Sequence, residues 1–432
     1  MRQNVRLVAL VACITGSLAC DFPRPANVGG QDAADGAVDA SGGDAANDGA
    51  VDIDALLSLC SANQPLRCEG NSLVRCNSDG TAEVRESCAL GCRSDELRCN
   101  DVRPSNGLAT FLDMTAGEPD LDLGTDAIIN TDEGTITVDG HSVAVRTATV
   151  TQSLAPTIRV FVVHRLLAGH VTVTGSDALA FVSDADITIG GTFAASATSS
   201  AQGPGGFNDT TCTGGDGATA QLRGGCGGGG FGFDGARGGD AVDDDGRSLG
   251  GRGGAATGSA TLVPLRGGCD SGIFSGLAGR GGGALQLVSR SKITIGGIVA
   301  ANGSSNTGGG SGGGILLEAP IVEIVGTVVA NGGAGAGGCP VPIPAEDGRL
   351  DATPAAGGAP CTFGGGGGRG GALNTGAGIG ATADRSGHSG AIGYGGHGGG
   401  SVGRIRINTV SGGLHATGVL SPTPSTGTIA TR

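Results

Sequence analysis

The chain has 432 residues, of which 90 are glycine, none is tryptophan and only 3% are aromatic. Aromatic side chains carry much of the burial energy in most cores, so this composition argues against an ordinary globular enzyme and favours an architecture that buries small aliphatic side chains repeatedly. A formal charge of −14, with Lys292 as the only lysine, argues against nucleic-acid binding because phosphate backbones repel an acidic surface.

An export signal occupies residues 1–20. Two arginines precede an apolar stretch at residues 7–18, which is too short to span a membrane, and Ala19-Cys20 ends it. This ending resembles a lipoprotein signal, in which a small residue precedes an acylated cysteine, although Ser17 and Leu18 depart from the usual pattern. We therefore expect Cys20 to be the first mature residue and to carry a lipid. The alternative is cleavage near Ala19 and soluble secretion.

Residues 21–57 form an acidic Ala/Asp/Gly linker. Eight aspartates lie between positions 21 and 54, and the segment has too few apolar residues to fold. As a flexible coil of about 35 residues it spans roughly 30–35 Å. We expect it to hold the rest of the protein away from a membrane of the cell envelope, at the outer membrane or cell surface.

Residues 58–101 form a small module that contains six cysteines. An even cysteine count in an exported chain predicts three disulfides, for which the sequence leaves fifteen pairings open. The turn signal at residues 77–80 lies between two short strand patterns and predicts a β-hairpin. Zinc is the competing interpretation, because residues 88–92 have ligand-like spacing. The six cysteines are Cys60, Cys68, Cys76, Cys88, Cys92 and Cys99.

Residues 102–432 form a Gly-rich domain with an internal repeat. Residues 187–196 recur as residues 293–302 and as residues 322–331, and each copy follows another short strand pattern. Strands of this length bury one row of side chains each, and stacking of like segments would make a continuous core. We therefore predict an all-β fold, a right-handed parallel β-helix in which glycines allow the bends at the corners.

Two long Gly-rich loops, residues 203–282 and 332–400, interrupt the repeat. Loops of this length are usually functional or disordered. We favour mobile loops, and the alternative is packing as extended polyglycine helices beside the strands. Within the loops we expect Cys212 to pair with Cys226 and Cys339 to pair with Cys361, which leaves Cys269 unpaired.

The whole chain resembles the Gly-rich surface lipoproteins of myxobacteria. The resemblance rests on the signal that ends in cysteine, on the Asp/Ala/Gly spacer, on the Gly-rich body and on three motifs of the cysteine module. It implies a cell-surface location and no particular chemistry. The three motifs are Arg67-Cys68-Glu69-Gly70-Asn71, Arg75-Cys76-Asn77-Ser78-Asp79-Gly80-Thr81 and Cys88-Ala89-Leu90-Gly91-Cys92.

Four short motifs resemble those of polygalacturonase-like enzymes, in which paired carboxylates supply acid and base. We assign no catalytic residues to them, because the first two lie over a hundred residues apart and because Gly-His-Gly arises easily in a Gly-rich stretch. They are Asn130-Thr131-Asp132, Asp243-Asp244-Asp245, Gly396-His397-Gly398 and Arg404-Ile405-Arg406.

No cofactor or metal is expected. Fragments at residues 214–217 and 239–240 resemble calcium-binding nonapeptides, but the tandem period is absent. The sequence thus favours a non-catalytic structural or adhesion protein, with a membrane, an extracellular polysaccharide or another surface protein as partner. The alternatives are polysaccharide binding or cleavage, and surface or ice binding by ordered polyglycine helices.

Overall fold

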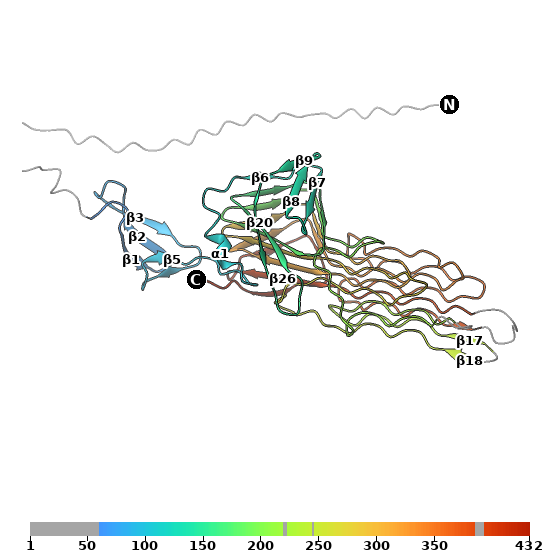
Figure 1. Cartoon of the computed structure of the whole chain (residues 1–432). Coiled ribbons are helices and arrows are strands. Elements are labelled where there is room, and N and C mark those ends of the chain that lie inside the picture. Colours follow the sequence, from blue (N-terminus) through green and yellow to red (C-terminus); the bar gives the residue numbers. More distant parts are fainter. Residues whose placement is uncertain (1–59, 219–222, 244–245, 385–392) are drawn as a thin grey trace, which may run out of the picture. The chain divides into compact units, whose positions relative to one another are not determined.

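The computed structural model describes residues 60–218, 223–243, 246–384 and 393–432, all within one compact unit, Leu57–Arg432. These residues form 29 strands and a single one-turn helix, α1 (Ala109–Leu112) (Figure 1). The prediction of an all-β chain is therefore confirmed for the described residues.

The cysteine module is built from two small antiparallel sheets. The expected hairpin forms, with Cys76 opposite Glu83 across its turn. The six cysteines make three disulfide-compatible pairs, Cys60–Cys76, Cys68–Cys92 and Cys88–Cys99, with Cα separations of 6.2, 5.7 and 5.1 Å. The strands are β1 (Pro65–Glu69), β2 (Ser72–Cys76) and β3 (Glu83–Ser87) in one sheet, and β4 (Cys92–Arg93) and β5 (Arg98–Cys99) in the other.

Three larger sheets each take one strand from every repeat (Figure 1). Sheet 1 contains, in spatial order, β10 (Arg146–Val150), β11 (Ile158–Val163), β14 (Ala178–Ser183), β19 (Ala284–Ser289), β22 (Gly314–Glu318), β26 (Arg404–Thr409) and β29 (Ser425–Thr428). Sheet 2 contains β27 (Leu414–Ala416), β23 (Ile321–Ile324), β20 (Lys292–Ile295), β15 (Ile187–Ile189), β12 (Leu166–Ala168) and β6 (Leu121–Asp122). Sheet 3 contains β28 (Val419–Ser421), β24 (Thr327–Val329), β21 (Ile298–Ala300), β16 (Thr192–Ala194), β13 (Val171–Thr174), β7 (Ala127–Asn130), β8 (Thr135–Val138) and β9 (His141–Val143).

The sequence repeat sets the register between these strands. Ile187 pairs with Ile293, and Ile293 pairs with Val322, in parallel strands of sheet 2. The prediction that the three copies are neighbouring parallel strands is confirmed. Antiparallel pairing in the three large sheets is confined to β10 with β11 and to β7, β8 and β9 at one end of the stack.

Burial differs between the sheets. Strands of sheets 2 and 3 alternate, as in β13, where Val171 and Val173 are buried and Thr172 and Thr174 are exposed. Every residue of β14, β19 and β22 in sheet 1 is buried. A second cluster, which includes Leu108 and Leu112, packs against the outer face of sheet 1, and this accounts for the continuous apolar runs of its strands.

A polar ladder follows the strands of sheet 3 at the end of each repeat copy. The Asn302 N–H donates to Ser196 Oγ (3.0 Å), the Asn331 N–H donates to Asn302 Oδ1 (2.8 Å), and Ser421 Oγ donates to Asn331 Oδ1 (2.6 Å). Because buried amides need partners, this ladder, together with the aliphatic rows, helps to set the register of successive repeats.

At the turns between sheet 2 and sheet 3, glycine is required because the backbones of successive repeats lie very close together, rather than because the chain bends there. A Cβ on Gly191 would lie 2.6 Å from the backbone of Gly169, and a Cβ on Gly297 would lie 2.0 Å from the Gly191 carbonyl oxygen. Gly326 and Gly418 continue the column, at 2.0 and 1.9 Å from the carbonyl below. Since these four residues do not adopt positive φ, the expectation that corner glycines serve the bends is wrong here.

The two Gly-rich loops are packed together, so the expectation of mobile loops is wrong for their described residues. Residues 224–230 exchange backbone hydrogen bonds with six other segments, at residues 212–215, 235–239, 251–254, 272, 309 and 398–401. Figure 1 shows the extended segments running side by side. We call the described residues of the segments 203–282, 302–313 and 332–403 the glycine bundle.

Glycine is needed in the bundle because the backbones lie in contact. A Cβ on Gly228 would lie 1.9 Å from the Gly399 carbonyl oxygen, and a Cβ on Gly227 would lie 1.8 Å from that of Arg252. The bundle also contains a small three-stranded sheet of β18 (Gly246–Ser248), β17 (Ala241–Asp243) and β25 (Ala383–Asp384).

Backbone hydrogen bonds and ion pairs join residues 101–103 to residues 430–432, and we call this contact the clasp. Asp101 and Arg432 exchange two backbone hydrogen bonds of 3.0 Å each. The Arg432 guanidinium lies 2.6 Å from Asp113 and 2.9 Å from Asp101, and Arg290 also pairs with Asp101 at 2.9 Å. The hydrogen bond from Arg432 holds the pKa of Asp113 below its usual value.

We expect Arg432→Ala to lower the free energy of unfolding by about 1–2 kcal/mol at low salt, because charge-assisted hydrogen bonds to two carboxylates are lost. Denaturant unfolding at two salt concentrations measures this. The matched control is Arg165→Ala, whose single exposed ion pair to Asp120 is 3.7 Å long; equal effects of the two substitutions would contradict the clasp.

Candidate functional site

The four polygalacturonase-like motifs do not assemble into one site among the described residues. Asp132 lies at a surface cleft whose lining includes neither His397 nor Arg404, and Arg404 lines a different depression with Phe233 and Pro422. Asp244 and Asp245 lie outside the described residues.

His397 is fully buried, and its ring accepts a hydrogen bond from the backbone instead of facing solvent. Its Nδ1 accepts the N–H of Cys226 at 3.1 Å, and the Cys226 Sγ lies 3.2 Å from the same nitrogen. The proton of the neutral ring is therefore on Nε2, which is buried without a hydrogen-bond partner. The ring meets Phe274 edge-on, with centroids 4.8 Å apart. Burial lowers the pKa of His397 to about 4, so the ring is neutral at physiological pH.

Cys226 is an inert thiol inside the bundle. It is buried and unpaired, and burial raises the pKa of its thiol to about 12. A nucleophile needs the thiolate, so the Cys226–His397 contact has no catalytic character.

The expected Cys212–Cys226 disulfide is therefore wrong, and so is the assignment of Cys269 as the unpaired cysteine. Cys212 pairs with Cys269, with a Cα separation of 5.9 Å across 57 residues. The Cys226 Sγ instead lies 3.2 Å from His397 Nδ1. Cys339 pairs with Cys361, as expected.

The cleft at Asp132 has a volume of about 580 Å³ and a lining rich in serine and threonine. It lies beside β13, after which the chain turns at Gly175 and Ser176, and the loop that follows β16 forms its other wall. Hydroxyl groups dominate, and Val173 and Ala201 are its principal apolar members. Polar residues of the lining include Asp132, Thr172, Thr174, Ser200, Gln202 and Arg280.

Asp132 is held in the ionised form. Its Oδ1 accepts both the Ser176 hydroxyl and the Ser176 N–H at 2.7 Å. These hydrogen bonds lower the pKa of Asp132, whereas burial raises the pKa of the neighbouring Asp177. Arg159 fixes the same turn by donating to the carbonyl oxygens of Thr131 (2.7 Å) and Asp132 (2.9 Å).

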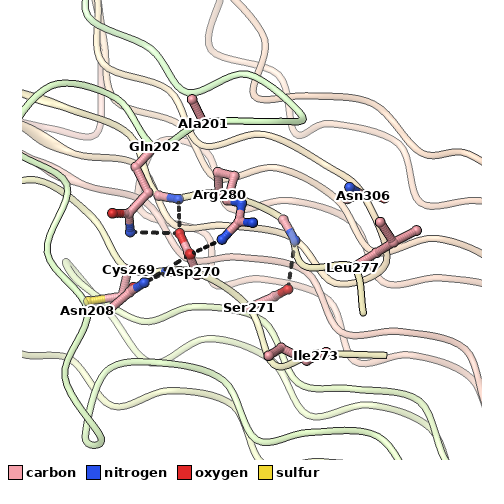
Figure 2. Close-up of polar contacts among 12 residues, drawn as sticks. Ala201, Gln202, Asn208, Cys269, Asp270, Ser271, Ile273, Leu277, Arg280 and Asn306 are labelled. Carbon is pink, nitrogen blue, oxygen red and sulfur yellow. Dashed lines mark hydrogen bonds and ion pairs between the residues drawn. The ribbon is translucent and has the colours of Figure 1, made fainter. Parts of the chain in front are cut away.

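A second carboxylate, Asp270, lies beneath the other wall of the cleft. It is 3% exposed and accepts hydrogen bonds from Gln202 (2.8 Å), Asn208 (2.9 Å), Arg280 (2.8 Å) and the N–H of Gly281 (2.8 Å). Figure 2 shows these donors converging on the one side chain. The network fixes the positions of Gln202 and Arg280, both of which line the cleft.

Sequence reasoning identified Asp132 within a motif and missed Asp270, Arg280 and Gln202. The one available signal was the position of Asp270 directly after Cys269, which ties that segment to Cys212. Nothing in the sequence indicated that residues near 132, 202 and 280 would meet.

The aspartates of the calcium-like fragments have structural partners. Asp216 Oδ1 accepts the N–H of Ile273 at 2.7 Å. Asp240 is 2% exposed; burial raises its pKa, but the N–H of Gly250 and two arginines, Arg237 and Arg247, lower it more, and the result is below the usual value. Within the described parts of the chain, no group of three His, Cys, Asp or Glu side chains is arranged to hold a metal ion.

Cys20, where we expect a lipid, and the expected linker at residues 21–57 lie outside the described residues. Over residues 60–432, with the gaps given above, no helix has the length and apolar character needed to cross a bilayer.

Compared with known proteins, the chain matches no family model, no curated protein and no solved structure.

Proposed function

We propose that the chain is a non-catalytic, cell-surface structural or adhesion protein, tethered by a lipid on Cys20 and built as a right-handed parallel β-helix with an attached glycine bundle. The fold part of the proposal is supported by five consecutive strand triplets, from β11–β12–β13 to β26–β27–β28, which add one strand to each sheet in turn. Right-handed crossovers are the rule for parallel strands.

The observation that carries the function is the glycine bundle. Its central segment, residues 224–230, is bonded to six neighbouring segments through backbone groups. Such an array makes a stiff and closely packed body. Two disulfides, Cys212–Cys269 and Cys339–Cys361, reinforce it. Stiffness of this kind suits a protein that projects from a surface and bears load.

Polysaccharide cleavage is the alternative from the motifs, and it has little support. His397 is buried, and among the described residues of the four motifs Asp132 alone lines the cleft. A glycosidase needs two carboxyl groups on either side of the bond. Asp270, beneath the other wall of the cleft, is buried and fully engaged by four donors.

The proposal is tested with the full chain expressed in a bacterium that exports and lipidates proteins. We expect the protein to fractionate with membranes, to be accessible to antibody on intact cells and to increase attachment of the cells to polysaccharide-coated beads. The Cys20→Ala variant should be released from membranes in soluble form. Release of new reducing ends from the coating, abolished by Asp132→Asn, would replace this proposal with the enzymatic alternative.

A further inference from the structure

The cleft at Asp132 is suited to hydroxyl-bearing ligands. Thr172 and Thr174 are exposed on the same side of β13, and Ser200 is exposed on the opposite wall. Each hydroxyl donates and accepts one hydrogen bond or more. A volume of about 580 Å³ accommodates a ligand of a few sugar rings.

Two side chains of the cleft are held in place before any ligand arrives. Asp270 accepts hydrogen bonds from Arg280 and Gln202, which fixes both groups from beneath. The Arg280 side chain is nevertheless 35% exposed. A guanidinium held in place in this way lowers the entropic cost of binding, because little side-chain freedom remains to be lost.

The charges of the cleft select against an anionic ligand. The lining contains one carboxylate, Asp132, and one guanidinium, Arg280, whose charge is already paired with Asp270, and the whole chain carries −14. A phosphate or uronate would be repelled by the net charge of the chain. A metal ion would find no set of three ligand side chains among the described residues, and the many hydroxyl-bearing residues of the lining favour a sugar over a lipid.

We propose that this cleft binds a neutral polysaccharide, with the Asp132 carboxylate accepting sugar hydroxyls and the Arg280 guanidinium donating to sugar oxygens on the facing wall. The inference rests on the proposed adhesion function and names its ligand class. No aromatic residue lines the cleft, so a single site binds weakly. Firm attachment would then come from many copies on one cell engaging one polymer.

The test uses the disulfide-bonded protein and a panel of hexasaccharides: gluco-, manno- and xylo-oligosaccharides as neutral probes and oligogalacturonate as the anionic probe. We expect at least one neutral probe to bind with a Kd of about 1 mM or tighter, and Asp132→Asn to weaken it roughly tenfold, since one charge-assisted hydrogen bond is worth about 1.4 kcal/mol or more. Ala201→Trp, which places a large side chain at the exposed mouth of the cleft, should abolish binding.

The matched control is Glu133→Gln, an exposed neighbour of Asp132 in the same turn that does not line the cleft. It should leave binding unchanged. Binding that survives Ala201→Trp, preference for oligogalacturonate, or no binding of any neutral probe at 10 mM would overturn the cleft assignment. Attachment of cells that display Ala201→Trp separates the two proposals: persistent attachment overturns only the cleft, whereas no attachment by cells with the unaltered chain overturns the adhesion function itself.

Discussion

Gly228→Ala is expected to lower the free energy of unfolding by on the order of 4 kcal/mol or to prevent the glycine bundle from forming. The added methyl group would lie 1.9 Å from the Gly399 carbonyl oxygen and 2.8 Å from the N–H nitrogen of Gly400. Both of these atoms belong to the backbone, so no flexible side chain can move away to make room. Separation of the segments would also break hydrogen bonds from Gly228 to Ala236 and from Gly254 to Gly228.

The matched control is Gly376→Ala in the same bundle. A Cβ there meets no atom within 4 Å, and Gly376 does not adopt positive φ. This substitution should be neutral or should stabilise the protein by up to about 1 kcal/mol, through the lower entropy of the unfolded chain. Because the chain has no tryptophan and one tyrosine, denaturant unfolding is best followed by circular dichroism. Equal destabilisation by both substitutions would show that backbone contact is not what requires glycine.

The second large effect concerns pH. His397 has an unperturbed pKa of about 6.5 in the unfolded chain and a pKa of about 4 in the folded protein. Between these values the unfolded chain binds a proton that the folded protein does not. The stability that depends on a neutral His397 is therefore complete above pH 6.5 and is lost as the pH falls toward 4. The loss amounts to about 3 kcal/mol.

The measurement is the free energy of unfolding at several pH values between 4 and 7. In His397→Asn, the amide oxygen can still accept the N–H of Cys226 but does not titrate. This variant should be less stable at pH 7 and should lose about 3 kcal/mol less than the unaltered chain on acidification. His415→Gln, at an exposed histidine, should follow the unaltered profile. If His397→Asn also follows it, the buried histidine is not the group responsible.

The strand repeat could be predicted from the sequence because side chains carry the information. Ile187, Ile293 and Val322 occupy equivalent places in similar segments, and aliphatic rows stack only when those places align. The polar ladder through Asn302 and Asn331 was present in the same copies, as the residue after the last aliphatic position.

The bundle could not be predicted because its partners are chosen by backbone groups. Glycine segments look alike in sequence, and nothing in residues 224–230 specifies that Gly309 and Gly398 are neighbours. The wrong pairing of Cys212 had the same cause: the nearer cysteine was preferred, although the packing of segments brings Cys269 to it across 57 residues. The cleft could not be predicted either, because Asp132 and Arg280 come from distant parts of the chain.

The segment at residues 224–230 also constrains how the protein folds. It exchanges backbone hydrogen bonds with Gly309, Gly398 and Ser401, the last more than 170 positions downstream. Contacts of such long range make the folding rate slow. The centre of the bundle therefore cannot close until the chain as far as Ser401 is available to it, and until then its buried backbone remains open to water and to proteases.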